Sequence, residues 1–270
     1  LGWMMIPPQQ SNNSSRNRTC LPDGYDSISK MKKEVCNNNF ISIDDAMNRL
    51  GYGHFQVLIV WAAGLCFMAD SMEIMLLSFL SRVLKDKWKL STEEEALITA
   101  IVFGGSILGT LMLGRCGDIM GRRPIFLASA SIISFFGVAT AFTNRYETFL
   151  FARFMVGFGV GGLTVPFDIL AECLPTSYRG TYLLVIDFFW TAGSMLVPMI
   201  AYVTIGYYDS WKSFVTVCAL PCVISTVFGY YYVPESPRWL ICQGRHKEAL
   251  AILRNAAKLN GKEPDNLFPH

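Results

Sequence analysis

Charged residues are scarce in this chain of 270 residues. Only 16% of them are Asp, Glu, Lys or Arg, and 52% are hydrophobic, whereas soluble domains carry about 25% charged residues. Because an ordinary soluble domain cannot bury so large an apolar fraction, we expect a lipid bilayer to cover much of it. The net charge is only +2, and the basic residues form no stripe, which argues against a nucleic-acid partner.

Catalytic and metal-binding patterns are also missing. His54, His246 and His270 are dispersed outside the apolar runs, so no Ser/His/Asp arrangement converges. The eight cysteines lack the paired spacing of zinc ligands, and most lie in apolar runs, where a thiol packs as a small hydrophobe. We therefore expect a protein that is not an enzyme and has no cofactor or metal, and we assign no disulfide.

What the chain does have is long apolar runs. A membrane-spanning helix needs about 20 apolar residues, and six stretches qualify: about 55–80, 95–114, 124–143, 148–170, 181–203 and 212–233. The expected fold is an all-α membrane protein with six transmembrane helices. Gly105 with Gly109, and Gly157 with Gly161, are each spaced four apart, which predicts close crossings of the second and fourth spans.

The spans divide the chain into three parts. Residues 1–50 are polar and lack the apolar core of a signal peptide, so we expect a mostly disordered tail with a short helix over Ile43 to Leu50. Residues 51–240 form the six-helix domain. Residues 241–270 begin a linker, in which Arg245 to Leu259 has an apolar face at helical spacing and predicts an amphipathic helix against the cytoplasmic surface.

Basic residues set the orientation. With the amino terminus inside, sixteen of the 23 Lys and Arg residues fall on the cytoplasmic side, as the positive-inside rule requires. Both termini are therefore expected in the cytoplasm. The loop Gly114–Arg123, which carries three arginines around Asp118, is then expected to reverse the chain at the cytoplasmic surface.

Three motifs follow one another on this side. Gly114 to Arg123 resembles the signature loop G-x-x-x-D-x-x-G-R-R of the major facilitator superfamily, with Cys116 where many members have Leu. Pro166 to Gly180 resembles the pattern P-x-x-x-x-x-E-x-x-P-x-x-x-R-G after the fourth helix of sugar and organic-ion porters. Pro234 to Leu240, P-E-S-P-R-W-L, resembles the stretch after their sixth helix. Three such matches in order identify the chain as similar to this superfamily.

Within the superfamily, the chain resembles the synaptic vesicle 2-related group. The segments Asp44 to Gln56 and Met68 to Glu73 carry this resemblance, which extends to about Lys262. It implies a carrier of small organic ions in a vesicle or plasma membrane. The family fold has twelve spans in two halves, each half a 3+3 repeat of helices, so the chain is expected to be an amino-terminal half whose partner half is missing, or a six-span protein that dimerises.

Charged side chains inside the spans point to the chemistry. Asp70 and Glu73 share one face of the first span, about 10 to 15 Å from its outer end, and Arg153 lies about 8 Å deep in the fourth. Such residues are costly in lipid and usually line a wet route. We predict that Arg153 pairs with Glu73 or Asp70, leaving one carboxylate free for a proton or a cationic substrate. A static pair without a transport role is the alternative.

Asp187 lies in the fifth span beside Phe188, Phe189 and Trp190, and an acid beside aromatic rings can hold an organic cation. We assign Asp187 and Trp190 a role in binding substrate or protons, although such rings also pack simply against lipid. The spans contain almost no Asn or Gln, so organic cations, zwitterions or proton-linked acids fit better than sugars.

A second set of residues is predicted to gate the cytoplasmic mouth. Charge pairs there can form and break as the carrier alternates between states, although constant anchoring of helix ends is the other interpretation. The predicted gating residues are Gly114, Asp118, Gly121, Arg122, Arg123, Asp168, Glu172, Arg179, Glu235 and Arg238.

The expected function is a proton- or ion-coupled secondary carrier of small organic ions, working by alternating access. The alternatives are a sugar porter and a binding or regulatory membrane protein with a transporter fold. No Gly-rich phosphate loop follows a strand, since Gly157, Gly159, Gly161 and Gly162 lie within an apolar run. The lipid bilayer, a small organic ion and protons are the expected partners.

Overall fold

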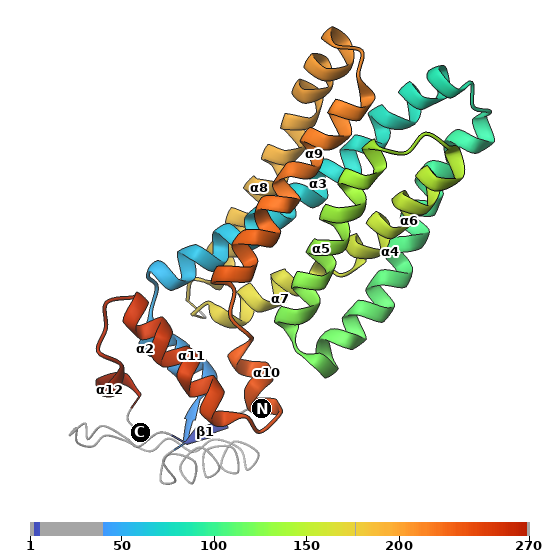
Figure 1. The fold of residues 1–270 in the computed structure, drawn as a ribbon. Helices are drawn as coiled ribbons and strands as arrows, with labels where there is room; N and C mark the ends of the chain where they lie inside the picture. The colour runs from blue at the N-terminus through green and yellow to red at the C-terminus, as the bar shows by residue number, and fades with distance from the viewer. Residues whose placement is uncertain (1–2, 6–39, 176, 269–270) are drawn as a thin grey trace, which may run out of the picture.

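A computed structural model describes residues 3–5, 40–175 and 177–268. Five of its helices are long and apolar enough to cross a membrane: α3 (His54–Trp88), α4 (Thr92–Met120), α5 (Arg122–Ala141), α8 (Arg179–Ala201) continued by the π-helix η1 (Tyr202–Tyr207), and α9 (Trp211–Tyr232). They form one bundle with α6 (Tyr146–Gly161), as Figure 1 shows. In it, α4 packs along α6, α3 along α8 and α9, and α5 along α6 and α9.

The fourth expected span is not one continuous helix. It consists of α6 (Tyr146–Gly161) and α7 (Thr164–Cys173), which are separated at Gly162 and Leu163. Glycines weaken a helix, and Gly162 meets Ser129 of α5 so closely that a Cβ there would overlap the hydroxyl oxygen. Thr110 Oγ1 of α4 donates to the carbonyl of Gly161 at 3.1 Å, which satisfies one acceptor at the break.

The expected loop Gly114–Arg123 is mostly helix, which corrects the prediction from sequence. Residues Gly114 to Met120 complete α4, and only Gly121 separates it from α5. Continuing the helix satisfies backbone groups that an open loop would leave to the solvent. Gly121 makes the turn with a φ of +112°, a conformation that favours glycine.

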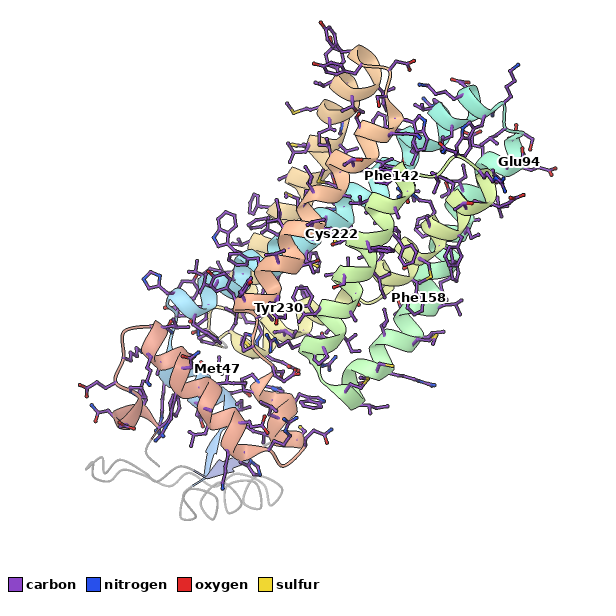
Figure 2. All side chains as sticks on the ribbon, viewed as in Figure 1. Met47, Glu94, Phe142, Phe158, Cys222 and Tyr230 are labelled. Carbon is purple, nitrogen blue, oxygen red and sulfur yellow. The ribbon has the colours of Figure 1, made fainter. Side chains whose placement is uncertain are left out.

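The first turn of α4 shows why this helix begins at Thr92. Ser91 Oγ accepts from the backbone N–H of Glu94 at 3.2 Å, and Glu94 Oε2 accepts from the N–H of Ser91 at 2.8 Å. This reciprocal pair caps the helix, and the acids in the first turn suit its positive end. Glu94 and Phe142 lie at the end of the bundle opposite Met47 (Figure 2).

Small residues set the crossing of α4 and α6, as the glycine spacing predicts. An added methyl at Gly105 or Gly109 would overlap the carbonyl oxygens of Phe154 or Phe158, and one at Gly157 would overlap that of Val102. The two backbones therefore touch, which is the role of small residues in membrane helix pairs.

Four short helices gather at one end of the bundle, close to both termini (Figure 1): α2 (Ile43–Leu50), α10 (Pro237–Cys242), α11 (His246–Leu259) and α12 (Pro264–Leu267). We call this the basal end; it includes the α4–α5 turn at Gly121. The short helix expected at Ile43 to Leu50 is confirmed as α2. The strands β1 (Trp3–Met5) and β2 (Phe40–Ser42) pair antiparallel, which the expectation of a mostly disordered tail did not include. Residues 6–39 lie outside the described part.

The amphipathic helix expected at Arg245 to Leu259 is α11, but other helices cover its apolar face. Ala249, Leu253 and Ala256 are buried in a cluster that also holds Met47 and Leu50 of α2. Burial of this face against α2 and α10 stabilises a protein layer at the basal end. A helix lying on the membrane surface would instead leave the face to lipid.

Candidate functional site

A buried ion pair joins two of the membrane helices. Arg153 Nη1 of α6 lies 2.7 Å from Glu73 Oε2 of α3, with side chains 0% and 4% exposed. The predicted partnership of Arg153 is thus formed with Glu73 rather than with Asp70. Phe149, one turn earlier on α6, places its ring centroid 5.8 Å from the guanidinium carbon, an attraction that strengthens in a dry site.

The pair does not satisfy all of its polar atoms. Glu73 Oε1 and Arg153 Nε and Nη2 are buried without a hydrogen-bond partner among the described residues. Glu73 Oε1 faces Gly137 of α5 and Glu73 also borders a cavity of about 70 Å³ between α3, α4 and α6. A buried charge must be paired to be tolerated, so each member holds the other in place.

Asp70 has no basic partner in the part of the chain that the structure describes. Its Oδ1 is buried and accepts no hydrogen bond from the described residues, although the residue as a whole is partly exposed. Phe67, three positions earlier and so on the same face of α3, contacts Phe167 and Trp190 with ring centroids 5.9 and 6.4 Å apart. The unpartnered oxygen of Asp70 and this group of rings thus both involve the same face of α3, and carboxylates and aromatic rings are the groups that bind organic cations.

Asp187 lies apart from this group. Its side chain is exposed on α8, and its backbone carbonyl accepts from Thr191 Oγ1 at 2.9 Å. Trp190 is one turn further along α8 and half-buried against Phe67. The structure thus brings Trp190 to the α3 side chains, whereas Asp187 stays on the open face of α8, and the roles of both residues remain predictions.

The predicted gating residues meet at the basal end. Arg122 bridges two carboxylates, with Nη2 3.2 Å from Asp118 Oδ1 and Nη1 3.0 Å from Asp168 Oδ2. Arg123 Nη2 donates to the carbonyl of Tyr230 at 2.8 Å. Gly114 lies inside α4, and a Cβ built there would meet none of the described residues outside its own helix backbone within 4 Å.

Glu235 binds the amino terminus of α5. Its Oε1 accepts from the backbone N–H groups of Arg122 and Arg123, at 2.8 and 3.1 Å, and from that of Ser236 at 3.0 Å. A carboxylate at this position satisfies free donors and suits the helix dipole. The other carboxylate oxygen occupies the space where a Cβ of Gly121 would lie. A larger residue at this position would therefore displace the Glu235 side chain, and it would also have to adopt the φ of +112° that favours glycine.

The residues after Glu235 reach three more elements. Ser236 Oγ donates to Glu172 of α7, Arg238 Nη2 donates to Asp44 of α2 at 2.7 Å, and Trp239 Nε1 donates to the carbonyl of Asp118 at 2.9 Å. Glu172, which was predicted to take part in charge pairs at this end, thus accepts a hydrogen bond from a hydroxyl group.

Sequence reasoning missed several of these residues. Asp44, Phe67, Ser236 and Trp239 contact predicted site residues, and Phe167 contacts Phe67. Ser236 and Trp239 lie within the P-E-S-P-R-W-L stretch, which was a usable signal. Asp44 lies 194 positions from Arg238, and no local pattern could have joined them.

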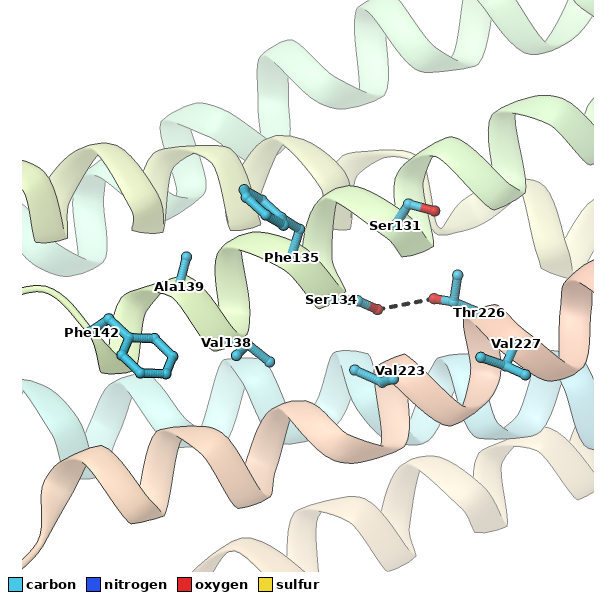
Figure 3. A pocket seen from close by; sticks show the side chains of 9 residues that line it. All are labelled: Ser131, Ser134, Phe135, Val138, Ala139, Phe142, Val223, Thr226 and Val227. Carbon is cyan, nitrogen blue, oxygen red and sulfur yellow. Dashed lines mark hydrogen bonds between the residues drawn. The ribbon is translucent and has the colours of Figure 1, made fainter.

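One groove on the bundle lies away from this chemistry. With a volume of about 550 Å³, it runs between α5 and α9 and is lined mainly by apolar side chains such as Phe135 and Val223 (Figure 3). At its floor, Ser134 Oγ and Thr226 Oγ1 are 3.0 Å apart. None of the predicted site residues lines it, so it is not the candidate site.

With this geometry in place, the comparisons with known proteins can be interpreted. Residues 46–267 match the family described as sugar (and other) transporter. The chain belongs to this family. It is a multi-pass membrane protein of the major facilitator superfamily whose spans are helical, with relatives among the synaptic vesicle 2-related proteins.

Curated relatives cover most of the chain. It is 35% identical to the organic cation/carnitine transporter 7 of Arabidopsis thaliana over 83% of its own length and 44% of the relative's. It is 34% identical to the human putative transporter SVOPL over 87% and 47%, and 33% identical to human synaptic vesicle glycoprotein 2B over 82% and 35%. The chain therefore spans less than half the length of these relatives.

Solved structures show the same fold. A proton:xylose symporter, XylE, bound to 6-bromo-6-deoxy-D-glucose superposes with a TM-score of 0.69 at 22% identity, over 80% of this chain and 53% of that one. The partially occluded inward-open form of XylE from E. coli gives 0.67 at 22% identity, over 79% and 58%. At this identity the likeness concerns the fold alone, and it covers about half of the symporter.

The cap on α5 leads to a first prediction. Glu235→Ala should lower the free energy of unfolding by about 1–2 kcal/mol, because the free N–H groups of Arg122 and Arg123 lose their acceptor. Denaturant unfolding of the purified chain in detergent would measure it. Glu263→Ala is the control and should change stability by less than about 0.5 kcal/mol, because this exposed acid directly before α12 makes no side-chain cap to the backbone and, among the described residues, accepts only from the Asn266 amide. Equal effects of the two changes would contradict the capping role.

Proposed function

We propose that this chain is one six-helix half of a secondary carrier that moves small organic ions by alternating access, coupled to protons or another ion. The observation that carries this proposal is the different state of the two acids on α3. Glu73 is neutralised by Arg153 at 2.7 Å, whereas Asp70 Oδ1 is buried with no partner among the described residues. One carboxylate is therefore available for a cation.

The surroundings of Asp70 favour an organic cation or a zwitterion over a sugar. The ring group Phe67, Phe167 and Trp190 offers aromatic surface, and aromatic faces attract desolvated cations. A relative's name, organic cation/carnitine transporter, is consistent with this substrate class. A proton can occupy the same carboxylate when the cation is absent, which would couple the two.

Alternating access requires a second half, which we propose packs against α4 and α8. These are the least buried candidate spans, with 28% and 17% of their most apolar windows buried. Ile107 of α4 and Phe188 and Met195 of α8 are 64%, 74% and 67% exposed. The exposed face also carries Asp187, which would then face the route between the halves rather than lipid.

Within the half, the basal network supplies groups that can change partners. Arg122 already bridges Asp118 and Asp168, so a shift of α7 would exchange one carboxylate for the other. We propose that the basal end faces the cytoplasm, because the arginines of the α4–α5 turn and of α10 lie there. Both termini then lie inside, in a vesicle or plasma membrane.

Uptake of a labelled organic cation, tetraethylammonium, tests this function in proteoliposomes of the carrier with both halves. Asp70→Asn should reduce uptake at least about tenfold, since a desolvated cation loses its counter-charge. It should also flatten the dependence of uptake on pH, because the carboxylate that a proton could occupy is gone. Asp86→Asn, an exposed acid on the same helix, is the control and should leave uptake unchanged. Unchanged uptake in Asp70→Asn would contradict the coupling role, and uptake of glucose in place of the cation would favour a sugar porter.

A further inference from the structure

The short helix α2 and the turn after it form a strap across the basal end, which we define as residues 43–52. Ile43, Ala46, Met47 and Leu50 are buried on one face of α2, which packs on α11. The opposite edge of the strap turns toward α8 and α10. The strap therefore lies between the linker helices and the bundle.

Asp44 connects this edge to two arginines. Its Oδ1 accepts from Arg238 Nη2 of α10 at 2.7 Å and lies 3.6 Å from Arg179 Nη2, at the first residue of α8. The carboxylate is 44% exposed and the arginines are 39% and 32% exposed. Screening by water limits the strength of such contacts, which makes them breakable during a functional cycle.

Tyr52 makes a second connection to α8. Its ring stacks on Tyr182 with centroids 4.3 Å apart and an interplanar angle of 13°, and it lies 6.1 Å from the ring of Tyr178. Burial, together with a hydrogen bond to Tyr182, raises the pKa of Tyr52 well above its usual range. The strap thus holds the basal end of α8 by charge and by ring contact.

The far side of the strap is fixed to the end of α11. Lys262 Nζ donates to the carbonyl of Arg49 at 3.0 Å. Asn260 Oδ1 accepts from the N–H of Phe55 at 2.9 Å, and its amide donates to Gln56 Oε1 at 2.9 Å. These bonds tie the carboxyl-terminal part of the strap and the start of α3 to the linker, so a movement of the linker is passed through the strap to α8.

We propose that Asp44 and Tyr52 are positioning residues of the carrier, which latch the basal end of α8 through Arg179 and Tyr182. This rests on the proposed function in one respect, that α8 borders the transport route with Trp190 and Asp187. In this chain, α8 is the least buried of the five candidate spans. Release of the latch frees α8 to move relative to α3.

Cys173 provides a native reporter of the latch. Arg179 Nη2 also donates to the carbonyl of Leu174, at 3.5 Å, and the adjacent Cys173 at the end of α7 is 0% exposed. Loss of Asp44 loosens Arg179 and with it this end of α7. Changing the cysteines at positions 20, 36, 116 and 242 to serine leaves Cys173 together with Cys66, Cys218 and Cys222, which are buried within membrane-spanning helices.

The experiment measures the rate at which a charged maleimide labels Cys173 in this chain in nanodiscs, where both faces are accessible. Asp44→Asn should raise the rate about two- to fivefold, as expected for the loss of partly exposed ion pairs, and Asp44→Glu should restore it. Asp45→Asn, the exposed neighbour on the same helix, is the matched control and should stay within error. Tyr52→Leu should raise the rate, and Tyr52→Phe, which keeps the ring, should not.

Three results would overturn the latch. The first is equal labelling in the Asp44→Asn and Asp45→Asn chains, and the second is slow labelling in both Asp44→Asn and Tyr52→Leu. The third is faster labelling that rises only in proportion to a lower thermal unfolding midpoint, because it would show general destabilisation. The readout needs no substrate, so a labelling response together with unchanged uptake in Asp70→Asn would uphold the latch and reject the proposed function.

Discussion

Arg153→Leu is expected to lower the free energy of unfolding by about 3–5 kcal/mol, because it leaves Glu73 buried and charged without its partner. The guanidinium is 0% exposed and Glu73 4% exposed, so water cannot replace the lost contact. Glu73→Leu should cost a similar amount by leaving Arg153 unpaired. The double change should recover most of the loss, since two well-packed leucines replace two charges that were expensive to bury.

Denaturant titration of the four proteins in detergent, followed by tryptophan fluorescence, would give the coupling energy between the two sites. Lys85→Met provides the control, because the Lys85–Glu95 pair has the same 2.7 Å separation but lies 37% and 26% exposed. It should cost at most about 1 kcal/mol. Additive losses in the double variant would show that the pair is not a buried, interdependent unit.

Adjacent glycines in α4 should respond to alanine with opposite signs. Gly105→Ala places a methyl group against the carbonyl oxygen of Phe154 on α6, which is backbone and cannot turn aside. The methyl group forces α4 away from α6, which should lower the free energy of unfolding by about 1–3 kcal/mol. Gly104→Ala meets nothing within 4 Å and should stabilise the helix by about 0.5–1 kcal/mol, because alanine loses less conformational freedom.

Thermal unfolding midpoints of the two variants would test this difference directly. The same chemical change is made one position apart, so effects on expression or on the detergent cancel. If Gly105→Ala matched or exceeded the stability of the unchanged chain, the close approach of α4 and α6 would be wrong.

Some of the structure was predictable because it follows from local chemistry. The apolar runs define the long helices, since a backbone in lipid must satisfy its own hydrogen bonds. The spacing of Gly105 and Gly109 predicted a close crossing, and the three positions between Asp70 and Glu73 placed both acids on one face. The motif at Gly114 to Arg123 and the stretch Pro234 to Leu240 were sufficient for the family.

Other features could not be predicted because they depend on residues far apart. The break at Gly162 follows from contacts with Ser129 and Thr110. The hydropathy of an apolar run does not indicate such contacts. The extension of α4 through Gly114 was hidden by glycines and charges that usually mark loops. Likewise, the apolar face of α11 did not reveal that α2 covers it.

By itself, the sequence determined that this is a helical membrane protein of a transporter family, because length, hydropathy and short motifs are properties of neighbouring residues. Tertiary structure alone decided which acid on α3 takes Arg153, where Glu235 and Glu172 point, and that Asp44 reaches Arg179 and Arg238. Those choices depend on which side chains the packing brings within hydrogen-bond distance. Electrostatic energy in a dry interior changes steeply over such distances, and sequence spacing does not contain them.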